Sequence, residues 1–306
     1  MRVAALDVGT NTTRLLVADV DGDELREVHR ETRITRLGEG VDTRRRLLPA
    51  PIARVRNALA DYRRTAESLG AERALLVATS AVRDAENGEA FLGEIEWSYG
   101  FTTRLVNGDE EAQLTLSGVH PVRGTLVLDI GGGSTELVLD DFHTSLDIGS
   151  VRFTERYLHG DPPSSIELER CAEAVRAALA PIDLAAPAAV GVAGTITTLA
   201  ALDLGLDHYD RARVHGHRLS RDGARAQLER LAALPVEERR RVPALDPERA
   251  PVIVAGAVIL VEVLDRYALD AIEVSEHDIL DGIARAAAEL PARDEGSAPP
   301  GAFTCC

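Results

Sequence analysis

Two segments of the chain place carboxylate, glycine and hydroxyl groups in the same order. The first, LDVGTNTTRLLV, covers residues 6–17, and the second, LDIGGGSTELVL, covers residues 128–139. In each segment an aspartate ends an apolar run and is followed by glycine and then by hydroxyl-bearing residues. Glycine lets the backbone approach a ligand closely, and successive N–H groups in such a turn form an anion-binding concavity. The repeat therefore predicts a strand–turn–strand phosphate-binding loop in each half of the chain.

The residues expected to contact phosphate offer hydroxyl, amide or backbone N–H groups. They are Thr10, Asn11 and Thr12 in the first loop, and Gly131, Gly132, Gly133 and Ser134 in the second. The preceding aspartates, Asp7 and Asp129, would repel phosphate unless a divalent cation lay between them. Magnesium is held in this way, by one or two carboxylates together with phosphate oxygens and water. We therefore expect Mg²⁺ as the cofactor and these two aspartates as its ligands.

The two segments carry opposite charges at one matched position, which is Arg14 in the first and Glu136 in the second. The forked donors of an arginine suit a terminal phosphate, so Arg14 is predicted to bind phosphate. Glu136 is predicted to act in catalysis by positioning water or magnesium-bound water. The alternatives are an exposed strand arginine for Arg14 and a cross-strand ion pair for Glu136.

Two further positions are expected to bind phosphate because of where they follow strands. Arg83 comes just after the apolar run RALLVAT (73–79), and the carboxyl ends of strands in α/β folds face the ligand crevice. Gly194 and Thr195 open an expected helix, whose N-terminal N–H groups can bind an anion. An ordinary surface loop for Arg83 and an ordinary helix cap for the Gly-Thr pair are the competing interpretations.

Strand and helix patterns alternate along both halves of the chain, which predicts an α/β fold. Strands are expected at residues 3–8, 13–20, 73–79, 101–107, 125–130, 134–141, 145–149, 188–194 and 271–276. Helices are expected at residues 51–70, 89–100, 109–119, 165–182, 195–204, 220–234, 247–267 and 277–290. Proline and glycine in GVHPVRG (118–124) indicate a boundary. The predicted domains are therefore residues 1–120 and 121–290, followed by a disordered tail at 291–306.

Composition excludes several classes of function. The 306 residues carry a formal net charge of −16, and all 34 basic residues are arginines, so general nucleic-acid binding is not expected. The sequence has no apolar run of roughly 18 residues and no signal-peptide pattern at its start, so we expect a cytoplasmic protein without a membrane anchor. Its three cysteines fit neither a disulfide framework nor a zinc site.

Taken together, the motifs resemble those of the actin, Hsp70 and sugar-kinase superfamily, and within it the Ppx/GppA family. The resemblance covers about residues 1–290 and is carried by DVGTNTTRLLV, ATSAVRDAENG (78–88), GDEEAQL (108–114), DIGGGSTELV, GTITTLAAL (194–202), VHG (214–216) and VSEHDILDG (274–282). It implies two actin-like (ribonuclease H-like) domains with a catalytic cleft between them, in the short two-domain form. It also implies Mg²⁺-dependent hydrolysis of a terminal phosphoanhydride, and a homodimer.

The resemblance assigns the catalytic base to Glu111, which matches the family glutamate before the small residue in Glu-Glu-Ala. Without that match, an acidic helix start would be the better interpretation. The implied substrate is inorganic polyphosphate, of short chain length, or guanosine pentaphosphate. An actin-fold ATP-dependent kinase and a non-catalytic alarmone or polyphosphate sensor remain open alternatives. The last motif has Ser275, Glu276, His277 and Asp278 where the family has more glycine, so its contact with substrate is undefined.

Overall fold

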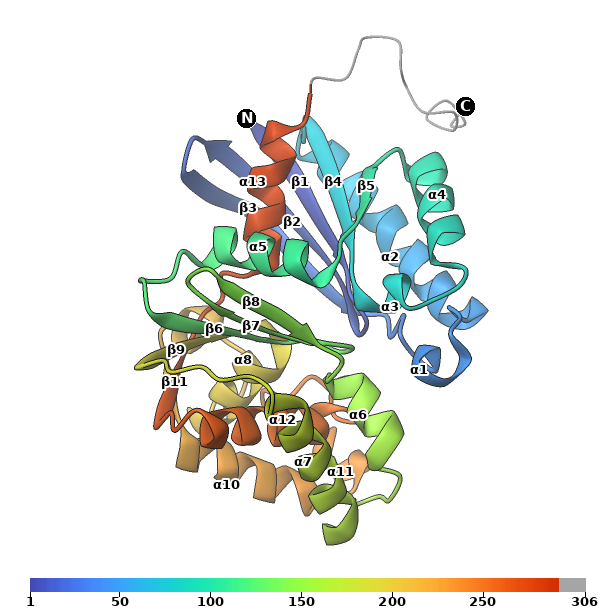
Figure 1. The fold of residues 1–306 in the computed structure, drawn as a ribbon. Coiled ribbons are helices and arrows are strands. Elements are labelled where there is room, and N and C mark those ends of the chain that lie inside the picture. Colours follow the sequence, from blue (N-terminus) through green and yellow to red (C-terminus); the bar gives the residue numbers. More distant parts are fainter. Residues whose placement is uncertain (292–306) are drawn as a thin grey trace. The chain divides into compact units, whose positions relative to one another are not determined.

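The computed structural model describes residues 1–291, and these form two compact units. Among these, unit 1 contains residues 1–119 and 278–291, and unit 2 contains His120–His277 (Figure 1). The predicted first boundary near residue 120 therefore lies beside the observed change of unit. The assignment of residues 278–290 to the second domain differs from the structure, which returns this segment to unit 1. The predicted disordered tail, apart from its first residue, lies outside the described residues.

Unit 1 is built on a five-stranded sheet in the order β3-β2-β1-β4-β5. Its strands are β1 (Arg2–Val8), β2 (Thr12–Asp21), β3 (Glu24–Ile34), β4 (Arg73–Ala78) and β5 (Thr102–Leu105). The first three form an antiparallel meander, and β4 and β5 continue parallel to β1. Its helices are α1 (Val41–Arg44), α2 (Pro49–Ser68), α3 (Ser80–Arg83), α4 (Gly88–Tyr99), α5 (Gly108–Val119) and α13 (Ile279–Glu289).

Both faces of this sheet are covered, because alternate side chains of a strand point to opposite faces. Leu6 of β1 packs into a core with Tyr62 of α2 and Ile95 of α4. Val3, from the same strand, packs into a second core with Ile283 of α13. Figure 1 shows α13 lying across β1 on this second face. The apolar face of α13 thus belongs to the unit 1 sheet, which is the physical reason for the corrected boundary.

Helices α5 and α13 touch through glycines. A Cβ added to Gly118 of α5 would lie 1.9 Å from the backbone oxygen of Asp278, and one added to Gly282 of α13 would lie 1.9 Å from the oxygen of Leu114. Real Cβ atoms do not come this close to a backbone carbonyl, so the crossing requires glycine on both helices. The contact fixes the helix that carries Glu111 against the segment that begins with Asp278.

We predict that Gly118→Ala lowers the free energy of unfolding by about 1–3 kcal/mol, the usual range for overpacking. Gly93→Ala in α4 is the matched control, since nothing lies within 4 Å of its added Cβ. That control should stabilise the protein by up to about 1 kcal/mol, because alanine is the better helix former. Urea denaturation of both variants tests this, and equal stabilities would contradict the close packing.

Unit 2 repeats the arrangement on a six-stranded sheet in the order β10-β11-β9-β6-β7-β8. Its strands are β6 (Thr125–Ile130), β7 (Thr135–Leu139), β8 (Phe142–Leu146), β9 (Ala188–Val192), β10 (Arg218–Ser220) and β11 (Ala271–Val274). Strands β6, β7 and β8 form the antiparallel meander, and β9 and β11 continue parallel to β6. Strand β10 adds to this sheet antiparallel to β11 and has no counterpart in the unit 1 sheet. The other five strands have the order and directions of unit 1, so the repeated sequence segments mark a repeated fold.

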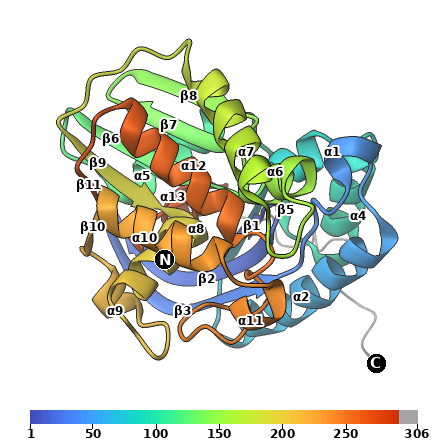
Figure 2. The ribbon, with the colours of Figure 1, turned by 90° about the horizontal axis from the view of Figure 1, so that it is seen from below.

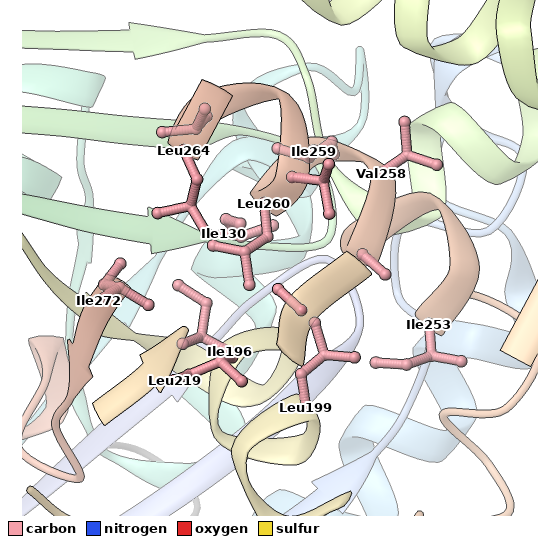
Figure 3. Packing of buried hydrophobic residues seen from close by; sticks show 14 of the residues in the cluster. Ile130, Ile196, Leu199, Leu219, Ile253, Val258, Ile259, Leu260, Leu264 and Ile272 are labelled. Atoms are coloured by element: carbon pink, nitrogen blue, oxygen red, sulfur yellow. The ribbon is translucent and has the colours of Figure 1, made fainter. Parts of the chain in front are cut away.

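Helices cover one face of the unit 2 sheet (Figures 1 and 2). They are α6 (Ser150–Tyr157), α7 (Ser165–Leu179), α8 (Ala193–Asp203), α10 (Arg221–Ala232) and α12 (Ile253–Arg266), with the short α9 (Arg211–Val214) and α11 (Val236–Arg239) at the periphery. In the core, Ile196 and Leu199 of α8 lie among Leu260 of α12 and Ile272 of β11 (Figure 3). Among residues 1–291, no helix is long and apolar enough to cross a membrane.

Most predicted strands and helices are present, with two corrections in the meanders. Strand β3 was not predicted, and the strand expected at 145–149 lies earlier, at Phe142–Leu146. Residues 147–149 instead lead into α6, where a Cβ on Gly149 would lie 2.4 Å from the oxygen of Gly132. Only glycine fits at this approach, and the Ser150 N–H donates to the Gly131 oxygen at 3.0 Å, so the chain turns towards the second predicted loop.

Helix α7 begins with a capping box that depends on an ionised glutamate. The Glu167 carboxylate accepts hydrogen bonds from the backbone N–H groups of His159, Gly160 and Ser164 and from the Ser164 hydroxyl, at 2.7–2.9 Å. These bonds, above all the one from the Ser164 backbone, lower the pKa of Glu167 to about 2. Ionised Glu167 therefore stabilises the folded protein above its unfolded-state pKa near 4.5, and this stabilisation is lost as the pH falls towards 2.

Glu167→Gln should therefore flatten the acid limb of stability between about pH 4.5 and 2. The variant should be less stable than wild type at pH 7 and converge with it at the acid end. Melting temperatures measured from pH 7 to 2 test this. Glu173→Gln, an exposed glutamate on the same helix, should leave the curve unchanged. A parallel shift of the whole curve in Glu167→Gln would contradict a lowered pKa for Glu167 in the folded protein.

Candidate active site

The first predicted loop connects β1 to β2. The backbone N–H of Gly9 donates to the Thr12 oxygen at 2.9 Å, which closes a tight turn. The Thr10 hydroxyl shares a 2.7 Å hydrogen bond with Ser80 at the start of α3. Asn11 is 6% exposed, and neither its Nδ2 nor its Oδ1 atom has a hydrogen-bond partner. A buried amide is costly to leave unpaired, so Asn11 is suited to receive a ligand with acceptor and donor groups, such as phosphate and its water.

Arg14 lies directly opposite Asp7 in the β1–β2 register. Its Nε and Nη2 atoms reach the Oδ2 atom of Asp7 at 2.9 and 2.8 Å, while its Nη1 atom donates to Asp278. Burial raises the pKa of Asp7, against the attraction of Arg14. Burial would lower the pKa of Arg14, but the two carboxylates outweigh it and raise the pKa. Arg14 is therefore a partly buried, permanently charged residue held between two acids, and its contact with phosphate stays a prediction.

The second predicted loop connects β6 to β7 with the same closure, since the Gly131 N–H donates to the Ser134 oxygen at 3.0 Å. Its carbonyl groups are bound by the start of α6, where the N–H groups of Val151 and Arg152 donate to Gly132 at 2.8 and 3.2 Å. Within residues 1–291, the N–H groups of Gly132 and Gly133 donate to no backbone oxygen. An anion-binding loop needs backbone N–H groups that are not used within the protein backbone. The Gly132 and Gly133 N–H groups meet this need, while the Gly132 carbonyl is occupied by α6.

Asp129 lies directly opposite Glu136 in the β6–β7 register, at the position that pairs Asp7 with Arg14 in unit 1. Both carboxylates are buried, with exposures of 8% and 2%. The Ser145 hydroxyl donates to Glu136 Oε1 at 2.7 Å. Like charges directly opposite in a sheet are destabilising, and burial increases the cost. The change of sign between the two sequence repeats thus converts an ion pair into a carboxylate pair.

The register shows which residues could hold Mg²⁺, the cofactor that the sequence predicts. Within the described residues, no group of three or more His, Cys, Asp or Glu side chains gathers in a way that could hold a metal. The Asp129–Glu136 pair offers two carboxylates, which matches the way magnesium is held by one or two carboxylates with phosphate and water. At Asp7, both Arg14 contacts fall on Oδ2, so Oδ1 lies outside that ion pair. The donors present therefore fit the ion.

Glu111 and Arg83 lie together in unit 1. Glu111 is 8% exposed in the first turn of α5, and its Oε2 atom lies 3.5 Å from Nη1 of Arg83. The same nitrogen donates to the Val106 oxygen at 2.8 Å, which orients the guanidinium. The neighbouring Glu110 has a different role, since its carboxylate accepts the Asn107 N–H at 2.8 Å and completes the cap of α5. The structure thus separates a capping glutamate from a buried one.

In unit 2, Gly194 and Thr195 lie in the first turn of α8, as predicted. A Cβ on Gly194 would lie 2.2 Å from Nη1 of Arg249, so this guanidinium covers the helix start. Sequence reasoning missed Arg249. The sequence predicts a helix at 247–267 that would contain it, but α12 begins only at Ile253 and Arg249 lies in the turn before it.

Asp278 was also missed as a site residue. It is 6% exposed and contacts Arg14 from the start of α13. The available signal was the DILD sequence at 278–281, in which two acids three residues apart precede an apolar run, as in a capping box.

With this geometry established, comparison with known proteins assigns the chain to a family. The model of the Ppx/GppA phosphatase family matches residues 16–286, and the chain belongs to this family. Solved relatives include an exopolyphosphatase-like protein with a TM-score of 0.88 and 35% identity over 92% of this chain and 97% of that one. An Aquifex aeolicus member has a TM-score of 0.80 and 31% identity over 95% of this chain and 99% of that one. The predicted family and the predicted pair of actin-like α/β domains are confirmed.

Two relatives within this phosphatase family have names that state an activity. Exopolyphosphatase 2 of Mycobacterium tuberculosis is 41% identical over 310 aligned positions, which cover 92% of this chain and 97% of that protein. A guanosine-5'-triphosphate,3'-diphosphate pyrophosphatase of Vibrio atlanticus is 28% identical over 92% of this chain and 58% of that protein. By name, the first acts on polyphosphate and the second on guanosine-5'-triphosphate,3'-diphosphate.

Proposed function

We propose that this protein is an exopolyphosphatase that removes the terminal phosphate of inorganic polyphosphate, and that it acts in the cytoplasm. The observation that carries the proposal is the buried Glu111, which is separate from the capping residue of its helix, in a chain that matches exopolyphosphatase 2 over 97% of that protein. A general base must lie within hydrogen-bond reach of the water proton that it accepts. A buried carboxylate beside an arginine that could bind the phosphate supports this role for Glu111. A homodimer remains a prediction from the family resemblance.

In the proposed reaction, Glu111 accepts a proton from water as the water oxygen attacks the terminal phosphorus. The bond from that phosphorus to the bridging oxygen breaks, and orthophosphate and a polyphosphate shorter by one unit leave. In unit 1, Arg83 and Asn11 would contribute side-chain donors to phosphate oxygens. In unit 2, the glycine loop between β6 and β7 would offer its N–H groups. Catalysis of this kind rests on positioning and charge stabilisation, since phosphoryl transfer needs little covalent chemistry from the protein.

Magnesium is part of the same proposal. Each unit offers one proposed carboxylate ligand, Asp7 in unit 1 and Asp129 in unit 2. The ion would neutralise charge on the phosphates, with Glu136 positioning water beside Asp129. The carboxylate pair between β6 and β7 supports this assignment, because a divalent cation would offset the repulsion between two buried acids that lie directly opposite each other. That both loops act on one phosphate chain stays a prediction.

Guanosine pentaphosphate is the alternative substrate, since both substrates present a terminal phosphoanhydride. The higher identity and the nearly complete coverage of exopolyphosphatase 2 favour polyphosphate over the guanosine derivative, whose named relative is matched over 58% of its length. A kinase or a sensor would have to use the same loops without activating water, and a buried Glu111 beside Arg83 favours hydrolysis.

Phosphate release measured with short polyphosphate, long polyphosphate and guanosine pentaphosphate, with and without Mg²⁺, tests the proposal. We expect Mg²⁺-dependent release, with the highest kcat/KM on short polyphosphate. Preference for guanosine pentaphosphate would select the alternative substrate. Binding of any of them without turnover, with no release in the presence of Mg²⁺, would overturn the hydrolase proposal and support a sensor.

A further inference from the structure

We infer that Asp278 is a positioning residue, which holds Arg14 of the first phosphate loop in the orientation that the reaction needs. The inference rests on the proposed function and adds a residue to it. Asp278 would act through Arg14 without itself touching phosphate, because an ionised carboxylate has no donor to offer a phosphate oxygen.

The contact itself is buried and specific. The Arg14 side chain is 15% exposed, and the carboxylates on either side of it, Asp7 and Asp278, are 6% and 9% exposed. Three of its donor positions are used, Nε and Nη2 by Asp7 and Nη1 by Asp278. If the guanidinium turned away from Asp278, it would leave a buried carboxylate without its charge partner, which is strongly unfavourable. Asp278 therefore removes the rotational freedom that Asp7 alone would leave to Arg14.

Asp278 is in turn fixed by its own surroundings. Its Oδ1 atom accepts the Leu280 N–H at 2.9 Å, and its N–H donates to Asp281 at 3.3 Å, so it forms one half of a capping box. Asp281 is 2% exposed and pairs with Arg30 of β3 at 3.0 Å. The start of α13 is thus held by charges on the same sheet that carries Arg14.

The same segment is tied to the helix that carries Glu111. The backbone oxygen of Asp278 lies against Gly118 of α5, and Gly282 lies against the oxygen of Leu114. Asp278 therefore contacts both Arg14, through its carboxylate, and α5, through its backbone oxygen. This places Asp278 where it can set the geometry between the phosphate-binding arginine and the proposed base, all within unit 1.

The net charge of Arg14, Asp7 and Asp278 indicates how this group can act on phosphate. Before a cation binds at Asp7, the two carboxylates and the guanidinium together carry one net negative charge. Arg14 then offers directed N–H donors and no surplus positive charge. Removing the charge of Asp278 would free a donor and make the group less negative. Ground-state binding of phosphate should then not weaken, while alignment in the transition state is lost. Such a change lowers kcat without raising KM.

Asp278→Asn isolates this role, because asparagine caps a helix about as well as aspartate but cannot form the ion pair. We expect kcat on short polyphosphate to fall roughly 10- to 100-fold, as misplacement of a positioning group can cause, with KM unchanged or lower. Asp210→Asn is the matched control, since Asp210 caps α9 through the N–H groups of Ala212 and Arg213 in unit 2. The control should keep wild-type kcat and KM.

A double-mutant cycle with Arg14→Ala decides whether Asp278 acts through Arg14. In the Arg14→Ala background, Asp278→Asn should change kcat less than about twofold, because coupled residues are not additive. Arg14→Lys, which keeps the charge and loses the fork, repeats the cycle if Arg14→Ala is too slow to assay. If the two substitutions lowered kcat independently, so that their fold-changes multiplied, the inference would be overturned. A wild-type kcat in Asp278→Asn would also overturn it, and in either case the proposed function would stand. A wild-type protein that releases no phosphate would instead overturn the proposed function.

Discussion

Glu111→Gln is expected to lower kcat for phosphate release by roughly 10²- to 10⁴-fold, the usual contribution of a general base. Glutamine has nearly the same shape and can keep a contact with Arg83, but it cannot accept the proton of water. KM should change by less than about threefold, because the interaction lost is one made only in the transition state. Steady-state phosphate release from short polyphosphate at saturating Mg²⁺ measures both constants.

The adjacent residue provides a matched control for this prediction. Glu110→Gln makes the same chemical change one position earlier, where the side chain caps α5 by accepting the Asn107 N–H. A glutamine oxygen can accept the same bond, so kcat should stay within about twofold of wild type. If the two variants lost activity equally, the loss would reflect the helix start, and Glu111 would no longer be the base.

The pH dependence of kcat gives a second readout of the same prediction. If Glu111 accepts the proton, the acidic limb of the kcat profile in wild type should reflect a carboxylate and should disappear in Glu111→Gln. An unchanged acidic limb in the variant would assign that limb to another group and would leave Glu111 with an electrostatic role.

The repeated loops were predictable from sequence because their chemistry is local. Glycine, a hydroxyl and an aspartate within a few residues dictate a strand–turn–strand unit, and the two loops close with equivalent hydrogen bonds, from Gly9 to Thr12 and from Gly131 to Ser134. The amphipathic α2 was predictable for a similar reason, since its buried positions recur at helical spacing. In both cases the local sequence pattern was enough to predict the structure.

What sequence could not supply was any feature decided by tertiary contact. Strand β3 reads ELREVHRETRI, a charged sequence that gives no alternating apolar signal, and it forms because β2 offers a partner edge. The final helix, α13, is present as predicted but belongs to unit 1 and not to the second domain. Its apolar residues predict a buried face, but they do not indicate which of the two sheets it covers. Arg14 shows the same limit, since its partner Asp278 lies far along the chain.

The carboxylate pair between β6 and β7 carries the second large expected effect. Asp129→Asn should lower kcat by roughly 10²-fold or more, because a metal ligand and the charge that it contributes are lost together. The same change should raise the stability of the metal-free protein by up to about 1 kcal/mol, since it removes the charge of one of two buried carboxylates at paired positions of β6 and β7. Loss of activity with a gain in stability is a signature that an ordinary structural residue would not give.

With Mg²⁺ present, wild type should become more stable than Asp129→Asn, the reverse of their order without the ion. A ligand that binds only the folded state stabilises it by RT ln(1 + [L]/Kd), so Mg²⁺ should raise the melting temperature of wild type in the absence of substrate. Asp129→Asn should show little of this rise. Scanning calorimetry with and without Mg²⁺ measures it independently of turnover. Asp141→Asn, an exposed aspartate just after β7, makes the same charge change and should keep the full response to the ion.

The two copies of the loop then differ for a physical reason. At Asp7 the opposite strand supplies Arg14, whose positive charge offsets that of the carboxylate. At Asp129 the opposite strand supplies a second carboxylate, so the two strands together present the negative charge that attracts a divalent cation. If Asp129→Asn were less stable than wild type without Mg²⁺ and equally responsive to the ion, the pair would be compensated internally, and the magnesium ligands would have to be sought elsewhere.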